Sequence, residues 1–318
     1  GGREMTDQEG GGPEAAGATG TPEDFRCGFV ALVGRANVGK STLMNTLVGA
    51  KLSIVSAVPQ TTRFPVRGIL HRGNSQLVFI DTPGVHKPRY RMNEEMVRLT
   101  ERVLREVDAV AVLVDASDGF GPGDRFVFEL LRQAGRRGLL ILNKVDLMSK
   151  ERLLPMIEEA NGTGLFEEIV PLSALNGENC DRLERLLLDR LPAGPPHYPP
   201  EILTDLPQRL AVSEIIREQV CLKTRQEIPH ATAVMIDSME QDANGLHRIN
   251  ATVLVDRESQ KGILIGEQGR MMKAIGTDAR RNLESTLGGP VHLSLWVKVR
   301  EGWRDDTSLL RLIGLPIP

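Results

Sequence analysis

Short apolar runs and amphipathic stretches alternate along the first two thirds of the chain. Apolar runs that are typical of buried strands occupy 27–33, 66–71, 76–81, 108–115, 138–143 and 166–173. Stretches with helical periodicity lie near 40–49, 93–107, 122–134, 149–160 and 179–191. Residues 66–81 have the pattern of a hairpin, whereas helices join the other strands. This order predicts an α/β domain with a mostly parallel six-stranded sheet and right-handed crossovers.

The pattern changes after the proline-rich stretch 192–205, which predicts a semi-rigid linker. Beyond it the sequence predicts helices at 206–224, 261–265 and 270–287, and strands at 230–240, 247–257 and 291–300. The resulting α-β-β-α-α-β order differs from the first half. We therefore expect one domain over 25–191 and a second, α+β domain over 206–318. Residues 1–24 carry almost no apolar side chains and predict a disordered tail.

A glycine-rich loop follows the first predicted strand and precedes the first predicted helix. It fits G-x-x-x-x-G-K-[ST], the pattern of a phosphate-binding loop in its required strand–loop–helix context. Its glycines let successive N–H groups turn towards phosphate, Lys40 adds a charge for the β- and γ-phosphates, and the Ser41 hydroxyl can ligate Mg²⁺. The predicted nucleotide contacts of this loop are Gly34, Arg35, Ala36, Asn37, Val38, Gly39, Lys40, Ser41 and Thr42.

A second candidate phosphate motif ends the strand 76–81. It consists of Asp81, Thr82, Pro83 and Gly84. An aspartate at this place typically holds Mg²⁺, here through water, and the N–H of Gly84 can face the terminal phosphate. An ordinary turn is the equal alternative for these four residues.

A third motif suits guanine. It comprises Asn143, Lys144 and Asp146 at the end of strand 138–143. The Asp146 carboxylate can accept two N–H bonds from the guanine edge that adenine does not offer, while Lys144 would lie along the base plane. Ser173, Ala174 and Leu175, at the end of the last strand, can supply a backbone N–H to the guanine carbonyl.

Two polar segments are predicted to sense the γ-phosphate. The first, switch I, contains Gln60, Thr61, Thr62 and Arg63, with Thr61 or Thr62 as the hydroxyl facing Mg²⁺. The second, switch II, spans 85–92. For switch I, the alternative is a merely polar loop. Val85 stands where a glutamine could orient water, and this predicts slow intrinsic hydrolysis.

In their order and spacing these motifs resemble GTPases of the translation-factor-related class. Related GTPases with a GxxNxGKS loop use the matching asparagine to help ligate K⁺. The resemblance therefore makes Asn37 a candidate K⁺ ligand, and simple bracing of the loop is the alternative.

Residues 263–276 resemble the helix–GxxG–helix of a KH domain, and the element order around them matches the bacterial variant. Such a loop approaches the RNA backbone, and the groove beside it holds about four nucleotides. The candidate RNA contacts are Ile265, Gly266, Glu267, Gln268, Gly269, Arg270, Lys273 and Arg280. Six basic and three acidic side chains over 257–281 form a local basic patch, although a solvated helix face would look the same. Glu267 departs from the basic residue that is commoner in such loops.

Two tryptophans near the C-terminus are further candidates. Trp296 and Trp303 can stack on bases. For Trp296, an anchor in the core or between domains is the favoured interpretation.

Composition and charge limit these possibilities. A net charge of −3 excludes a chain-wide polyanion-binding surface, so an RNA site must be a local patch. No apolar run reaches the length of a membrane span. The scattered Cys27, Cys180 and Cys221 predict reduced thiols and a cytoplasmic protein.

The motifs GRANVGKSTLMNTLVG, PQTTR, DTPGVHKP, NKVD, SEIIRE, ILIGEQGRMMKAIG and LWVKVREGW together resemble the Era family of bacterial GTPases, over about residues 25–315. The resemblance implies a GTP- and Mg²⁺-dependent enzyme whose KH domain binds the 3′ end of small-subunit ribosomal RNA during assembly of that subunit. Peripheral contact with the cell membrane is left open. The alternatives are an RNA-binding chaperone that senses GTP with negligible hydrolysis, and a small-molecule phosphotransferase, which the guanine motif disfavours.

Overall fold

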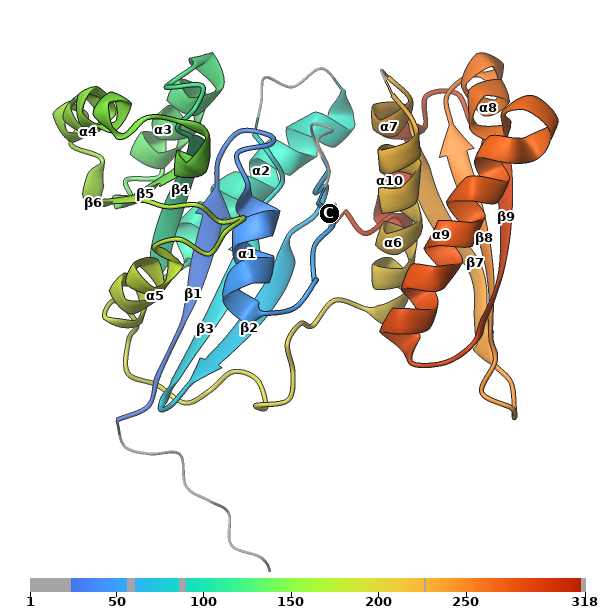
Figure 1. Ribbon diagram of the computed structural model, residues 1–318, viewed down its shortest axis with the longest axis horizontal. Helices are drawn as coiled ribbons and strands as arrows, with labels where there is room; N and C mark the ends of the chain where they lie inside the picture. The colour runs from blue at the N-terminus through green and yellow to red at the C-terminus, as the bar shows by residue number, and fades with distance from the viewer. Residues whose placement is uncertain (1–23, 56–60, 86–89, 226, 316–318) are drawn as a thin grey trace, which may run out of the picture.

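The computed structural model describes residues 24–55, 61–85, 90–225 and 227–315, and it shows two layered units side by side (Figure 1). The first contains a six-stranded sheet of order β2-β3-β1-β4-β5-β6, in which only the β2–β3 pairing is antiparallel. Its strands are β1 (Arg26–Val33), β2 (Val66–Arg72), β3 (Ser75–Asp81), β4 (Ala109–Asp115), β5 (Gly138–Asn143) and β6 (Phe166–Pro171). The predicted, mostly parallel sheet is confirmed.

Helices cover both faces of this sheet. They are α1 (Lys40–Val48), α2 (Arg91–Glu106), α3 (Pro122–Gln133), α4 (Leu153–Gly162) and α5 (Cys180–Leu188), with short 3₁₀ turns at Val145–Leu147 and Lys150–Arg152. Apolar side chains of α1 and α5 pack in one core, while those of α2, α3 and α4 pack in the core on the opposite face. Successive strand residues alternate between the two cores, because a strand points neighbouring side chains to opposite faces.

The second unit contains a three-stranded sheet of order β7-β8-β9, with β8 and β9 parallel. Its elements are α6 (Gln208–Lys223), α7 (Ile228–Ala231), β7 (Ala233–Gln241), β8 (His247–Val255), α8 (Glu258–Ile265), a 3₁₀ turn (Glu267–Gly269), α9 (Arg270–Leu287), β9 (Val291–Val299), a 3₁₀ turn (Trp303–Asp305) and α10 (Thr307–Leu312). Apolar residues of α6, α8 and α9 share one core with the sheet.

Several boundaries differ from the sequence-based predictions. The last strand of the first sheet ends at Pro171 instead of 173, and the helix predicted at 149–160 is divided into a 3₁₀ turn and α4. The strand expected from 230 begins at Ala233, because Pro229 lies in the first turn of α7, where its missing N–H costs nothing. Helices α7 and α10 were not predicted, since each is too short for a periodic pattern to show.

The stretch between the two units lies against the first unit. The Gln76 side chain accepts hydrogen bonds from the backbone N–H groups of His197 and Tyr198 at 2.8 and 3.1 Å, and it donates one to the Tyr198 carbonyl at 2.7 Å. Further along, the N–H of Ile69 in β2 donates to the carbonyl of Leu203 at 2.8 Å. The predicted linker is therefore hydrogen-bonded to β2 and β3 of the first unit at His197, Tyr198 and Leu203.

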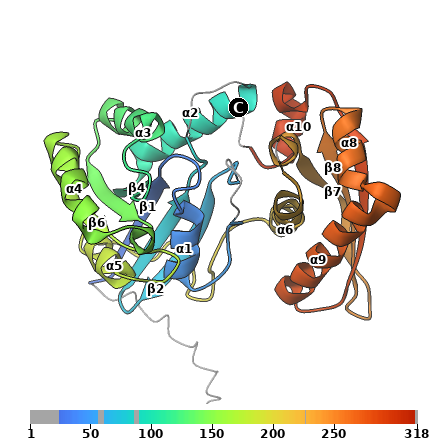
Figure 2. The same cartoon turned by 45° about the horizontal axis from the view of Figure 1, so that its top comes forward.

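An apolar cluster joins the two units. Met92, Met96 and Leu99 of α2 pack with Trp303 and Leu310, so that α2 faces the side of the second unit that carries α6 and α10 (Figure 2). Within the described residues, no helix is long and apolar enough to cross a membrane.

Candidate functional site: a nucleotide cleft and an open groove

The glycine-rich loop encloses a cavity of about 350 Å³ at the carboxyl ends of the strands. Gly39 has φ +100°, and a Cβ there would meet the Asn143 side chain at 2.2 Å. A Cβ on Gly34 would meet the Leu113 carbonyl at 2.5 Å. The cavity is lined by Ala36, Asn37, Gly39, Lys40, Ser41, Thr42, Ile54, Val55, Thr61, Thr62, Gly84 and Lys144. Only glycine fits at the two tight positions, and this explains the motif physically.

Lys40 is buried against its own loop. Its ammonium donates to the carbonyls of Gly34 and Arg35 at 3.1 and 2.9 Å. Burial lowers the pKa of Lys40 to about 8, and the carboxylate of Asp81 opposes that shift. The charge is thus held in a poorly solvated place, where an anionic ligand would interact with it strongly.

Three oxygens form a cluster at the inner end of the cavity. The Ser41 hydroxyl donates to Asp81 Oδ2 at 2.7 Å and lies 3.0 Å from the hydroxyl of Thr62, which itself donates to Asp81 at 3.3 Å. The other Asp81 oxygen, Oδ1, is buried and has no hydrogen-bond partner among the described residues. Burial raises the pKa of Asp81, whereas Lys40 works to lower it. Oxygen ligands and a carboxylate with an unused oxygen fit Mg²⁺, which binds few protein ligands and keeps several waters.

Of the two threonines predicted in switch I, it is Thr62 whose hydroxyl lies in this cluster. Arg63, the next residue, points away into the second unit. Its guanidinium donates to the carbonyls of Thr232 and Pro229 at 2.6 and 3.1 Å and lies 5.5 Å from the centre of the Trp303 ring. Gln60 and the part of switch II at 86–89 lie outside the described residues.

Val38 and Thr82 are among the predicted nucleotide contacts that do not line the cavity. The side chain of Val38 is fully buried in the core that contains α1 and α5. The hydroxyl of Thr82 is also buried and donates to the Leu32 carbonyl at 2.8 Å, so it fixes the end of β3 against β1. Thr82 is therefore not placed as a side-chain contact. Packing around these positions is long-range and could not be predicted from the motif.

The residues of the guanine motif differ in burial: Asn143 is buried, whereas Asp146 is exposed. Asn143 is buried; its amide nitrogen donates to the Val38 carbonyl at 2.7 Å and its oxygen accepts from the N–H of Ala174 at 2.9 Å. Both ends of this amide tie the phosphate loop to the loop after β6, and a contact of Asn143 with the nucleotide stays a prediction. Asp146 is exposed, and Lys144, at the cavity wall, pairs with Asp115 at 2.6 Å.

The second unit carries an open groove of about 650 Å³ between α9 and β9. Gly266 opens the GxxG turn with φ +70°, and a Cβ there would meet Met271 at 2.8 Å, so glycine is required. Glu267 lies 3.8 Å from Arg270 in an exposed ion pair. The groove is lined by Ile265, Gly269, Met272, Lys273, Gly276, Thr277, Arg280, Leu293, Leu295, Trp296 and Val297.

The two tryptophans exchange their expected roles. Trp296 is 50% exposed and lines the groove, so its interpretation as an anchor is wrong. Trp303 is fully buried between the units, donates to the Ala231 carbonyl at 2.9 Å and cannot stack on a base. Trp296 lies in an apolar alternating strand and Trp303 lies among charged residues, so the local sequence would favour the opposite burial and only the fold decides it.

These features together define a GTPase joined to a KH domain. They are a phosphate loop with a magnesium-type oxygen cluster, a guanine motif at a strand end and a groove beside a GxxG turn. Residues 29–144 match the family described as 50S ribosome-binding GTPase, and residues 227–304 match the KH domain family. The GTPase match disfavours the phosphotransferase alternative.

Two solved structures extend the likeness over both units. Era in complex with MgGDPNP and nucleotides 1506–1542 of 16S ribosomal RNA is 38% identical, with a TM-score of 0.89 over 92% of this chain and 100% of that chain. A tyrosine-to-alanine variant of Aquifex aeolicus Era bound to GDP·AlF₄⁻ is also 38% identical, with a TM-score of 0.88 and the same coverage. This chain belongs to the Era family of GTPases.

Proposed function

We propose that this chain binds Mg²⁺·GTP in the cleft, hydrolyses it, and binds the 3′ end of small-subunit ribosomal RNA in the groove between α9 and β9. Its work would be the assembly of the small ribosomal subunit, which places it in the cytoplasm. The observation that carries the proposal is the presence, in one chain, of the Ser41–Asp81–Thr62 oxygen cluster and an open groove beside a GxxG turn. The Era structure with 16S ribosomal RNA, similar over the whole length of that chain, supports the pairing of these two ligands.

The cleft residues have separate parts in this proposal. Lys40 contacts the β- and γ-phosphates, and the backbone N–H groups of the glycine-rich loop turn towards them. Ser41, Thr62 and Asp81 are the residues that would hold the metal, with Asp81 acting through water. When bound, Mg²⁺ neutralises charge that develops on the phosphates. Val85, buried beside the loop, offers no group that could orient the attacking water, so turnover by the chain alone is expected to be slow.

The base would lie at the edge formed by Asp146 and the loop after β6. The exposed carboxylate of Asp146 accepts from the guanine N1 and 2-amino groups. Because the N–H of Ala174 already donates to Asn143, the N–H of Leu175 is the candidate donor to the guanine carbonyl. Asn143 acts here by fixing the distance between the phosphate loop and this edge.

A potassium ion is part of the proposal for the phosphate side. Asn37 is exposed at the cavity, with a left-handed φ of +64° that turns this part of the loop outwards. We assign it as a K⁺ ligand, by which the ion would supply positive charge near the phosphates. Turnover should then be several times faster in K⁺ than in Na⁺ at equal ionic strength, and equal rates would remove Asn37 from this role.

The RNA would lie along α9 and β9. Lys273 and Arg280 are exposed at the groove and can contact phosphates, while Trp296 offers a ring on which a base can stack. The GxxG turn allows close approach of the backbone. Glu267, paired with Arg270, would weaken phosphate contact at the turn itself.

The test combines both sites in the full chain. Steady-state GTP hydrolysis would be measured with and without a 3′-end oligonucleotide of small-subunit ribosomal RNA, and RNA affinity with a GTP analogue, GDP and no nucleotide. The proposal expects turnover, and RNA affinity that depends on the nucleotide. Binding of GTP without turnover in any of these conditions would favour the RNA chaperone alternative, and a preference for ATP would exclude the GTPase role.

A further inference from the structure

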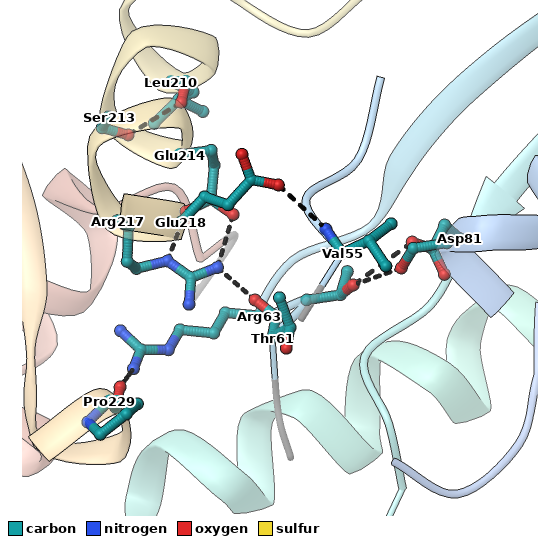
Figure 3. Close-up of polar contacts among 12 residues, drawn as sticks. Val55, Thr61, Arg63, Asp81, Leu210, Ser213, Glu214, Arg217, Glu218 and Pro229 are labelled. Atoms are coloured by element: carbon teal, nitrogen blue, oxygen red, sulfur yellow. Dashed lines mark hydrogen bonds and ion pairs between the residues drawn. The ribbon is translucent and has the colours of Figure 1, made fainter. Parts of the chain in front are cut away.

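Helix α6 belongs to the second unit, yet it contacts the segment between α1 and β2, which contains switch I, at Val55 and at Thr61 (Figure 3). At one end, the Glu218 carboxylate accepts a hydrogen bond from the N–H of Val55 at 3.3 Å and pairs with Lys51 at 2.6 Å. At the other end, the Arg217 guanidinium donates to the carbonyl of Thr61. Adjacent residues of one helix thus contact the two flanks of the segment that senses nucleotide.

The Arg217 side chain is fixed before it meets switch I. Glu214, one turn earlier on α6, accepts two hydrogen bonds from the guanidinium, at 2.7 and 2.6 Å. Arg217 is 3% exposed, and although burial acts against its charge, Glu214 raises its pKa above the ordinary value. A planar guanidinium held by a carboxylate fork has one orientation, so its remaining contact is made at a defined point.

That point lies one peptide bond from the candidate metal ligand. Arg217 holds the carbonyl of Thr61, the next residue is Thr62 in the oxygen cluster, and Arg63 is anchored to carbonyls of the second unit. Because a peptide unit is planar, fixing the Thr61 carbonyl also fixes the direction of the Thr62 N–H, and the anchored Arg63 side chain restrains the chain after Thr62. The Thr62 hydroxyl bonds to Ser41 and Asp81 within the GTPase unit, and the residues on both sides of it are held by the second unit.

We propose that Arg217 is a positioning residue of the GTPase site, assisted by Glu218, and that helix α6 sets the place of the Thr62 hydroxyl. This inference rests on the proposed Mg²⁺·GTP site. It predicts that the KH-domain helix contributes to the preference for GTP over GDP, since only GTP-bound states use the switch I hydroxyl. Helix α6 also connects the nucleotide cleft to the RNA groove, because its Val212, Ile216 and Val220 share a core with groove helix α9.

The test uses full-length Arg217→Ala and Arg217→Lys, with Arg209→Ala as the matched control. Arg209 lies on the same helix, is exposed, and among the described residues donates to carbonyls of β7, at Ile236 and Asp237. We would measure kcat and KM for GTP, the Mg²⁺ concentration for half-maximal turnover, and the affinities of fluorescent GDP and of a non-hydrolysable GTP analogue.

Arg217→Ala should lower kcat and the affinity for the analogue about tenfold each, as expected for loss of one charge-assisted hydrogen bond. It should raise the Mg²⁺ requirement and leave GDP affinity at the level of the control. Arg217→Lys, which keeps the charge and loses the fork, should fall between wild type and Arg217→Ala. Glu218→Gln keeps an acceptor for the Val55 N–H and should change the analogue-to-GDP ratio by about two- to threefold.

Two results would overturn the inference. An unchanged analogue-to-GDP ratio and kcat in Arg217→Ala would show that α6 is only a static anchor. Equal losses for GDP and the analogue, accompanied by a lower melting temperature, would show a structural role. If wild-type protein bound GTP no better than ATP, the proposed function itself would fail, and that result is separate because it needs no variant.

Discussion

The nucleotide cleft and the KH groove differ in how far their ligand-facing side chains are buried. In the cleft, Lys40, Asp81 and Thr62 are buried and bonded to one another or to backbone carbonyls. In the groove, Trp296 and Lys273 are exposed, and the floor is the open edge strand β9. A buried polar site penalises a wrong ligand heavily, whereas an open stacking surface accepts many bases. Single substitutions in the cleft should therefore cause large losses of ligand affinity, and those in the groove should cause small ones.

The largest effect is expected from Gly39→Ala. The new methyl group would lie 2.2 Å from the Asn143 side chain, at a φ of +100° that alanine does not tolerate. Nucleotide binding should be lost and the free energy of unfolding should fall by roughly 2–4 kcal/mol. Denaturant unfolding and binding of fluorescent GDP measure both.

Gly49→Ala is the matched control for this prediction. Gly49 ends α1 with φ +76°, but a Cβ there meets nothing within 4 Å. Only the backbone strain remains, about 1 kcal/mol, and nucleotide binding should persist. Equal behaviour of the two variants would contradict the account of the loop as a close-packed cradle.

Asp146→Ala should come next. In the proposed site, removal of the carboxylate would eliminate two charge-assisted hydrogen bonds to guanine, each contributing about 1.5–3 kcal/mol. GTP affinity should fall on the order of 10²- to 10⁴-fold, while the weak affinity for ATP stays the same. Competition binding against fluorescent GDP checks this. A parallel loss of ATP binding would show that Asp146 has a structural role and does not recognise the base.

Trp296→Ala tests the groove. Loss of one stacked base should weaken binding of the ribosomal RNA oligonucleotide by about 1–3 kcal/mol, with GTP turnover in the absence of RNA unchanged. Leu222→Ala is a suitable control, because Leu222 is a similarly exposed apolar side chain on α6, outside the groove lining. RNA affinity equal in the two variants would exclude stacking on Trp296.

The smallest effect is expected for Lys273→Gln. If Lys273 contacts one phosphate, the slope of log affinity against log salt should decrease by about 0.7 for single-stranded RNA. Titrations at several salt concentrations measure the slope. The same change in Lys51→Gln, whose side chain pairs with Glu218 away from the groove, would indicate a general charge effect.

Much of the fold could be predicted because its signals are local. The α9 helix has the predicted bounds, and the glycine-rich loop lies between the strand and helix that its pattern requires. Strand ends gather at one edge of a parallel sheet, so motifs at those ends were expected to meet. Short helices such as α7 and the break before α4 gave no periodic signal and were missed.

The sequence by itself determined the two units, the phosphate loop, the guanine motif and the GxxG turn, because each depends on residue types at fixed short spacing. Only the tertiary structure decided which threonine faces Asp81, that Asn143 braces the loop, and that Trp303 is buried while Trp296 is open. It also revealed Arg217 against Thr61, a contact between residues 156 positions apart. Such pairings depend on how two separate cores pack together, and no local pattern records that.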